Sequence, residues 1–154
     1  MNKFFKTLIW IAILAVAGFL IYSILPEYPQ SVIKGTFQPV VDTQAQVRID
    51  QIKVLTNKDL KSTYGTILES HTKMPAWVYK QEGATETVTF YGGGASLNLK
   101  DIPDHEDRLY TSCVVKVEFI INGNDVKINT YVEGNLEDDV VKDIVFQQLL
   151  AGND

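Results

Sequence analysis

Residues 111–133 read TSCVVKVEFIINGNDVKINTYVE and alternate between apolar and polar side chains, the pattern of two half-buried β-strands. Asn122-Gly123 lies between the two runs and is typical of a type I′ turn, in which both central residues need a positive φ. A two-residue or a four-residue loop places both inward-facing sets on one face of the hairpin. These sets are Cys113, Val115, Val117, Phe119 and Ile121, then Val126, Ile128, Thr130 and Val132. The stretch therefore predicts the central hairpin of an antiparallel sheet.

Two shorter strands are expected before this hairpin, at 76–80 and 86–91, joined by a turn around Gly83. The glycine run 92–94 is expected to end the second of them, and a polar loop then continues to about Arg108. Together with the hairpin, these segments predict a four-stranded antiparallel sheet.

A helix is predicted over 58–71, where apolar residues recur at helical spacing on one face. Thr63 could instead cap a shorter helix, because Gly65 weakens the longer one by about 1 kcal/mol. Pro75 forbids any continuation, since proline lacks the helical N–H donor. The predicted stripe comprises Leu60, Tyr64, Ile67, Leu68 and His71.

A last helix is predicted near 136–150, with Asn135 as its cap and acidic residues at the positive end of its dipole. The region 32–55 fits either a strand or a helix and is left open. The predicted fold class is α+β, with the four-stranded sheet packed on one face by helices. The apolar stripe of the last helix comprises Leu136, Val140, Val141, Ile144, Val145 and Leu149.

Residues 7–25, TLIWIAILAVAGFLIYSIL, carry no charge and predict a transmembrane helix. Nineteen helical residues reach roughly 28 Å, close to the hydrocarbon thickness of about 30 Å. A cleaved signal peptide would use Ala15-Val16-Ala17, but the mature chain would then begin with the exposed apolar run GFLIYSIL. A core helix of a soluble protein would show a polar face, which this segment lacks.

The charges that flank this segment predict its orientation. Lys3 and Lys6 precede it and Glu27 follows it, which places the N-terminus in the cytoplasm. Residues 1–6 are then a cytoplasmic tail, and the chain is a single-pass protein of the cell membrane. The prolines of 26–31 (PEYPQS) predict an extended linker, and an extracytoplasmic α+β domain follows over residues 32–154.

The charge of the exported part excludes one class of partner. The chain has a formal net charge of −5, and setting aside Lys3 and Lys6 leaves 12 basic and 19 acidic residues, or −7. A domain of this sign repels nucleic acid and anionic lipid, so we expect no nucleic-acid partner.

The order of residues in 64–92 resembles small, uncharacterised bacterial envelope domains. The resemblance rests on Tyr64-Gly65, then Pro75-x-Trp77, Gly83 and Val88-x-Phe90-x-Gly92, and 32–37 (VIKGTF) is similar to the start of such domains. More loosely, a helix followed by Trp77-Val78-Tyr79 and a meander is similar to outer-membrane assembly lipoproteins of the BamE type and to β-lactamase-inhibitor domains. Both act by binding other proteins, although the acylated cysteine of the lipoproteins is absent here. The resemblance implies a binding role and bacterial origin, and it implies no catalytic residue.

No motif in the sequence predicts a catalytic, cofactor or metal site. The loop 101–107 collects Asp101, Asp104, His105, Glu106 and Asp107, but it lacks the Asp-x-Asp-x-Asp-Gly spacing of a calcium loop, so a solvated acidic loop is the simpler interpretation. The glycine run 92–94 lacks the Gly-Lys-Ser/Thr that a phosphate-binding loop needs. Cys113 faces the core in the predicted hairpin and is expected to be an inert, buried thiol.

The candidate binding residues are Trp77 and Tyr79, which alternate on the first predicted strand. They belong to the core, or they form an aromatic protein-binding patch if that strand turns them to the polar side of the sheet. We therefore expect a non-enzymatic protein-binding or assembly module of the cell envelope, with another envelope protein as partner. The alternatives are an envelope domain that binds a small ligand and, as a third, a metal-dependent enzyme built on the 101–107 loop.

Overall fold

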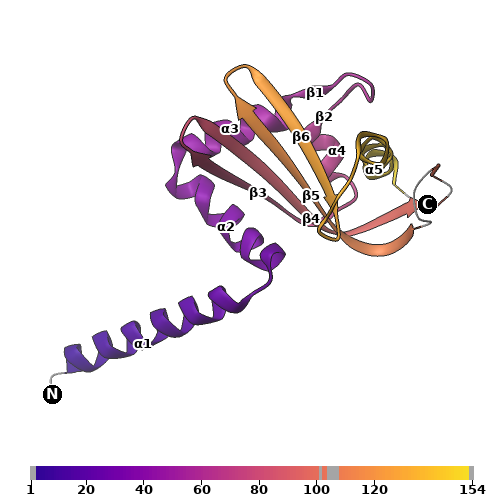
Figure 1. Cartoon of the computed structure of the whole chain (residues 1–154). Helices are drawn as coiled ribbons and strands as arrows, with labels where there is room; N and C mark the ends of the chain where they lie inside the picture. Colours follow the sequence, from indigo (N-terminus) through magenta and orange to yellow (C-terminus); the bar gives the residue numbers. More distant parts are fainter. Residues whose placement is uncertain (1–2, 101, 104–107, 153–154) are drawn as a thin grey trace.

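The computed structural model describes residues 3–100, 102–103 and 108–152. A long N-terminal helix projects from an α+β body, as Figure 1 shows. The helices are α1 (Lys3–Ile24), α2 (Glu27–Val41), α3 (Thr43–Val54), α4 (Tyr64–Glu69) and α5 (Asp139–Ala151). The strands are β1 (Thr56–Asn57), β2 (Ser62–Thr63), β3 (Lys73–Glu82), β4 (Thr85–Leu99), β5 (Arg108–Asn122), β6 (Asp125–Val132) and β7 (Asn135–Leu136).

Helix α1 is long and apolar enough, over Phe4–Ile24, to span a membrane or to act as a signal anchor. None of the side chains in its most apolar stretch is buried against the rest of the chain. Its apolar surface therefore has no partner within the described part of the protein.

The predicted central hairpin is confirmed. Strands β5 and β6 pair antiparallel with Phe119 opposite Ile128, so both inward-facing sets lie on one face of the sheet. The turn differs in one detail. Asn122 pairs with Asp125 and stays in the strand, so the two loop residues are Gly123 and Asn124. Of these only Gly123, with φ of 61°, has a positive φ, so the predicted type I′ turn at Asn122-Gly123 is wrong.

The main sheet has five strands in the order β3-β4-β5-β6-β7, so the prediction of four strands is wrong by one. The extra strand, β7, contains Asn135 and Leu136, which were expected to begin the last helix. Gly134, with φ of 80°, turns the chain back so that these two residues pair with β6. The helix begins only at Asp139, because the Asp138 carboxylate caps it by accepting a 3.0 Å hydrogen bond from the Val141 N–H.

The glycine run 92–94 does not end β4, which continues to Leu99. Gly94 takes a φ of 63°, and the register with β5 shifts between Gly92 and Ala95, as in a β-bulge. A Cβ at Gly93 would lie 2.6 Å from the Tyr28 hydroxyl oxygen, which accepts a 3.0 Å hydrogen bond from the Gly93 N–H. The glycines therefore admit a bulge and a close tyrosine contact, and they do not interrupt the strand.

The region left open at 32–55 is helical, and the predicted extended linker at 26–31 is wrong. Helix α2 begins at Glu27, because Pro29 falls in its first turn, where the missing N–H donor has no cost. Helix α3 follows after Asp42, whose carboxylate accepts a 3.1 Å hydrogen bond from the Ala45 N–H. The conformation of 26–31 is decided by the packing of α2 on the sheet.

The predicted helix over 58–71 is too long, and the shorter alternative is the one that forms. Thr63 caps α4, its hydroxyl accepting a 3.3 Å hydrogen bond from the Thr66 N–H, and the preceding residues make the small β1–β2 hairpin. Asn57 closes that hairpin by accepting hydrogen bonds from the N–H groups of Asp59 and Leu60, each at 3.0 Å.

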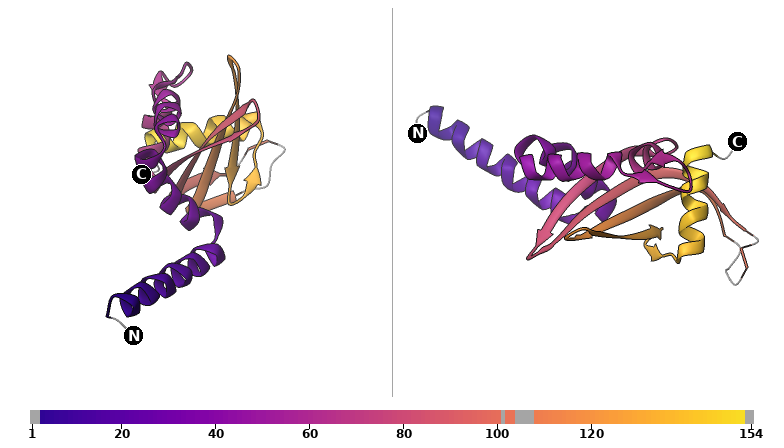
Figure 2. Two further views of the ribbon diagram at one scale, coloured as in Figure 1. Left: turned by 90° about the vertical axis from the view of Figure 1, so that its left-hand side faces the viewer. Right: turned by 90° about the horizontal axis from the view of Figure 1, so that it is seen from above.

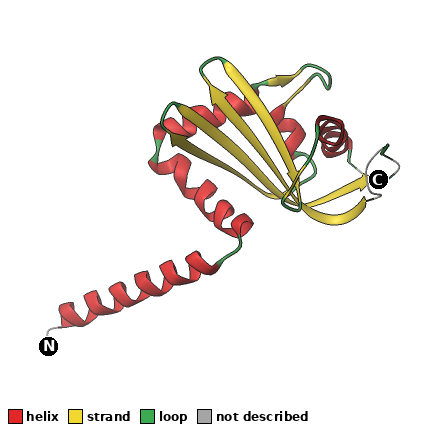
Figure 3. Ribbon diagram, in the orientation of Figure 1, coloured by secondary structure: helices red, strands yellow, loops and turns green. Residues whose placement is uncertain are grey.

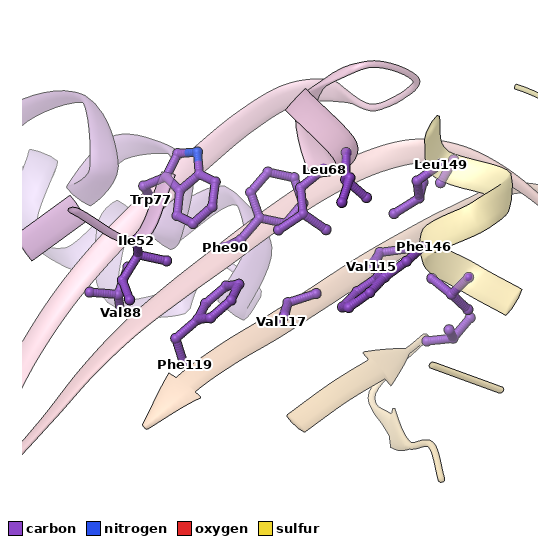
Figure 4. Close-up of a cluster of buried hydrophobic side chains, with 14 of the residues drawn as sticks. Ile52, Leu68, Trp77, Val88, Phe90, Val115, Val117, Phe119, Phe146 and Leu149 are labelled. Atoms are coloured by element: carbon purple, nitrogen blue, oxygen red, sulfur yellow. The ribbon is translucent and has the colours of Figure 1, made fainter. Parts of the chain in front are cut away.

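The main core lies between one face of the sheet and helices α3, α4 and α5 (Figures 2 and 3). Helix α2 instead reaches the opposite face at the β3 edge, where Tyr28 and Val32 pack on Ala76, Val78 and Tyr91. The expectation that helices pack on one face alone therefore needs this correction. Figure 4 shows the centre of the main core, which includes Ile52, Leu68, Trp77, Val88, Phe90, Val115, Val117, Phe119, Phe146 and Leu149.

The edge strand β3 is protected by α2. The Gln38 side-chain amide donates a 2.7 Å hydrogen bond to the Tyr79 carbonyl, and its oxygen accepts a 2.8 Å bond from the Tyr79 N–H. One side chain thus pairs both backbone groups of an edge residue, which blocks strand addition at that point.

One buried hydroxyl in the core yields a prediction. Thr130 is 1% exposed on the inner face of β6, and its Oγ1 has no hydrogen-bond partner among the described residues. Because an unpartnered buried hydroxyl costs roughly 1–3 kcal/mol, Thr130→Val is expected to raise the free energy of unfolding by about 1 kcal/mol. Denaturant unfolding of the two chains in detergent measures this difference, and a loss of stability would show that the hydroxyl is satisfied, for example by water.

Candidate functional site

The second face of the sheet carries the candidate site. We call it the open face, defined by Thr87, Thr89 and Tyr91 of β4, by Lys116, Glu118 and Ile120 of β5, and by Tyr131 of β6, which pairs with Lys116. These residues alternate with the core residues of the same strands, so the pleat turns them away from α3, α4 and α5.

A groove of about 430 Å³ runs between this face and the first turns of α2. Its walls bring together the end of α1, one side of α2 and three neighbouring strands. Lysines 34, 80 and 116 and glutamates 27, 82 and 118 contribute both signs of charge. The remaining lining residues are Tyr22, Gln30, Ser31, Val78, Thr87, Thr89, Tyr91 and Ile120.

Lys116 is the centre of a network of charges on the open face. Its Nζ lies 3.1 Å from Glu27 Oε1 and 3.1 Å from Glu118 Oε1. It also stands 4.9 Å from the Tyr131 ring centroid and 5.8 Å from that of Tyr91, within cation–π range. Burial lowers the pKa of Lys116, but the hydrogen bonds to Glu118 and Glu27 outweigh it and leave that pKa raised.

The two tyrosines hold the carboxylates of this network in place. The Tyr91 hydroxyl donates a 2.8 Å hydrogen bond to Glu27 Oε1, and the Tyr131 hydroxyl donates a 2.9 Å bond to Glu118 Oε2. The first of these bonds lowers the pKa of Glu27, against burial and together with Lys116. The stabilisation that ionised Glu27 contributes is therefore present above the ordinary pKa of a glutamate. It is lost as the pH falls through the lowered pKa of Glu27.

A second hollow, of about 310 Å³, lies on the other side of the same network. It shares Glu27, Tyr91 and Lys116 with the groove and extends to Val114 in the middle of β5 and to Glu133, which follows β6. The network therefore stands as a polar ridge between two depressions. Such a surface presents hydrogen-bond donors and acceptors at fixed positions, and this arrangement suits recognition.

Trp77 and Tyr79 do not belong to this surface. They are 6% and 5% exposed and face the main core, so the predicted exposed aromatic patch is wrong and the core alternative holds. The Gln44 side-chain amide donates a 2.7 Å hydrogen bond to the Tyr79 hydroxyl oxygen. The aromatic residues of the open face are Tyr91 and Tyr131, and their alternation with core residues in two strands was the signal that could have identified them.

The other residues singled out in the sequence lie apart from the groove. Cys113 is buried, and burial raises its thiol pKa to about 12, which agrees with an inert thiol. His71 follows α4 and is exposed, and its Nδ1 lies 2.8 Å from the Leu149 carbonyl oxygen. Asp101 and residues 104–107 of the acidic loop lie outside the described residues. Within the described ranges, no group of three or more His, Cys, Asp or Glu side chains is placed to hold a metal ion.

The resemblance noted in the sequence stays a prediction. In comparisons with protein families, curated proteins and solved structures, no family model, no curated protein and no solved structure matched this chain.

Proposed function

We propose that this chain is a membrane-anchored, non-enzymatic binding or assembly module of the cell envelope, which binds another envelope protein through the open face. The observation that supports the proposal is the Lys116 network, which presents paired charges and two tyrosines on a sheet face that α3, α4 and α5 leave uncovered. Tyrosine is enriched at the centres of protein interfaces, and complementary charges around such a centre select the partner and its orientation.

In this proposal α1 is the anchor and fixes the topology. Lys3 and Lys6 stay in the cytoplasm, and the sheet domain lies on the opposite side of the membrane. Tyr22, near the end of α1, lines the groove, so the binding surface lies close to the bilayer. A partner that is itself a membrane protein, or a segment close to the membrane, can therefore reach this binding surface from the side of the bilayer.

Reversing the charge at the centre of the network tests the proposal. A tagged full-length chain is isolated in mild detergent from its own membranes, and co-purifying proteins are quantified by mass spectrometry. Lys116→Glu is expected to reduce recovery of a stoichiometric envelope partner by about tenfold or more, because it places three carboxylates together at an interface centre. Lys58→Glu is the matched control, since Lys58 makes the same charge change on the exposed β1–β2 turn.

The thermal unfolding of both variants is measured in parallel, so that a folding defect is recognised. Full retention of the partner by folded Lys116→Glu would contradict the proposed surface. Turnover of a substrate by the purified chain, abolished by a point substitution, would contradict the non-enzymatic assignment.

A small-ligand receptor is the second candidate, and the size of the groove supports it. A volume of about 430 Å³ falls within the roughly 300–1,000 Å³ of ligand pockets. Native mass spectrometry of the full chain released from detergent tests this alternative. A retained small molecule that is lost in Lys116→Glu would favour it over a protein partner.

A further inference from the structure

We propose that the outer face of α2 lies in the headgroup region of the bilayer that α1 spans. The inference rests on the proposed anchoring by α1. It concerns a surface separate from the groove, which we call the α2 stripe: Ile33, Phe37, Val40 and Val41. These residues follow each other at i, i+4, i+7 and i+8, the spacing of one helix face.

The α2 stripe is apolar and lies in solvent. Phe37 is 64% exposed and Val40 81% exposed, although both are large apolar side chains. Contiguous apolar side chains at helical spacing on a surface mark an interaction site, whereas single exposed ones do not. Lys34 is exposed at the boundary between the stripe and the groove, whose wall it also lines, and a lysine at this position can extend its ammonium toward phosphate groups.

The opposite side of α2 is held by the domain, so the helix cannot rotate to bury the stripe. A Cβ at Gly35 would lie 2.9 Å from the Trp77 carbonyl oxygen and 3.1 Å from its nitrogen, which shows how closely α2 approaches β3. Gln38 is hydrogen-bonded to both backbone groups of Tyr79, and Val32 packs beside Val78. The stripe therefore faces outward as a fixed surface.

The connection to α1 identifies the bilayer as the occupant. Only Leu25 and Pro26 separate the two helices, and α2 turns back from the end of α1, as Figures 1 and 2 show. If α1 spans the membrane, Ile33 lies nine residues from its end and is held near the lipid surface. An amphipathic helix placed there gains stability by burying its apolar face at the boundary of headgroups and acyl chains.

A second copy of the chain is the competing occupant, and the size of the stripe argues against it. A stable protein interface buries about 800 Å² on each partner, which four side chains do not supply. The charge of −7 after the span disfavours attraction to anionic lipid, so the inference requires only apolar burial and a zwitterionic bilayer is the appropriate probe.

The test places a nitroxide label on single introduced cysteines of the full-length chain in phosphatidylcholine bilayers. Labels are placed at Val40, at Leu14 in the middle of α1, and at Lys58 on the β1–β2 turn, which lies far from α1 in Figure 1. Collisions of each label with oxygen, which concentrates in lipid, are compared with collisions with a water-soluble nickel chelate. The chain with its native Cys113 alone, which is 2% exposed, measures background labelling.

The label at Val40 is expected to resemble that at Leu14, with an excess of oxygen collisions, while the label at Lys58 meets mainly the chelate. Adding Phe37→Ser, a change at an exposed position, is expected to raise chelate access at Val40 at least about twofold, because it removes apolar area from the stripe. A label at Val40 as accessible to the chelate as that at Lys58, with Leu14 shielded, would overturn this inference and leave the anchor intact. Chelate access at Leu14 would overturn the anchoring itself and the inference with it. Spin–spin broadening at Val40 that disappears on dilution with unlabelled chain would assign the stripe to a second copy.

Discussion

Trp77→Ala is expected to lower the free energy of unfolding by about 3–5 kcal/mol, the range for removing a large buried aromatic side chain. The indole lies against the Phe90 ring at 5.0 Å and the Phe119 ring at 6.1 Å between centroids. Its Nε1–H donates a 2.7 Å hydrogen bond to Glu69 Oε1, and the Lys53 ammonium stands 5.7 Å from its ring. The substitution therefore removes the side chain through which β3 contacts both α3 and α4.

Guanidinium unfolding of the full-length chain in detergent, followed by far-ultraviolet circular dichroism, measures this loss. Trp10→Ala is the matched control, because Trp10 is 65% exposed on α1 and its removal is expected to leave unfolding of the sheet domain unchanged. Trp77→Phe is expected to recover part of the loss, since it keeps an aromatic ring but not the bond to Glu69. A cost below about 1 kcal/mol for Trp77→Ala would contradict the core assignment.

Arg108→Ala is expected to cost about 3–5 kcal/mol, because it leaves a buried carboxylate without its partner. Arg108 Nη1 and Nη2 donate to Glu137 Oε1 and Oε2, each at 2.8 Å, and the Glu137 side chain is only 5% exposed. The hydrogen bonds to Glu137 raise the pKa of Arg108 against the effect of burial, so the guanidinium stays charged. This pair ties the start of β5 to the segment between β7 and α5.

The double variant Arg108→Met, Glu137→Met distinguishes a net contribution of the pair from the cost of leaving one charge unpaired. It is expected to be far more stable than Arg108→Ala and close to the original chain, because two apolar side chains of similar length need no hydrogen bonds. Thermal unfolding of the original chain, Arg108→Met, Glu137→Met and the double variant in one detergent gives the coupling energy. If the double variant loses as much free energy of unfolding as the single variants, the ion pair itself stabilises the fold. The loss in the single variants is then more than the cost of leaving one buried charge unpaired.

The alternation in residues 111–133 was sufficient to predict the central hairpin. A strand exposes every second side chain to one face, and a slip of one residue would bury Lys116 and expose Phe119. The same alternation places Lys116 and Glu118 on the other face, so the position of these two residues of the candidate site was contained in the pattern. The α1 segment was equally clear, because length and apolar composition alone identify a helix able to span a membrane.

The remaining features were decided by contacts distant in sequence. The alternation of Trp77 and Tyr79 fits either core or surface positions. Only the packing of β3 against α3 and α4 places both side chains in the core. The prolines of 26–31 suggested an extended chain, yet the packing of Tyr28 and Val32 on the β3 edge stabilises a helix there. Glu27 and Lys116 form an ion pair although they lie 89 residues apart in the sequence, and no local pattern predicts that contact.

Local periodicity thus determined the apolar helix, the central strands and the face that each strand residue occupies, since these depend on backbone geometry that repeats over a few residues. Tertiary structure alone decided the path of α2, the fifth strand and the groove. Each of these depends on which surfaces pack together in the folded chain. The free energy of that packing comes from contacts between residues far apart in the sequence.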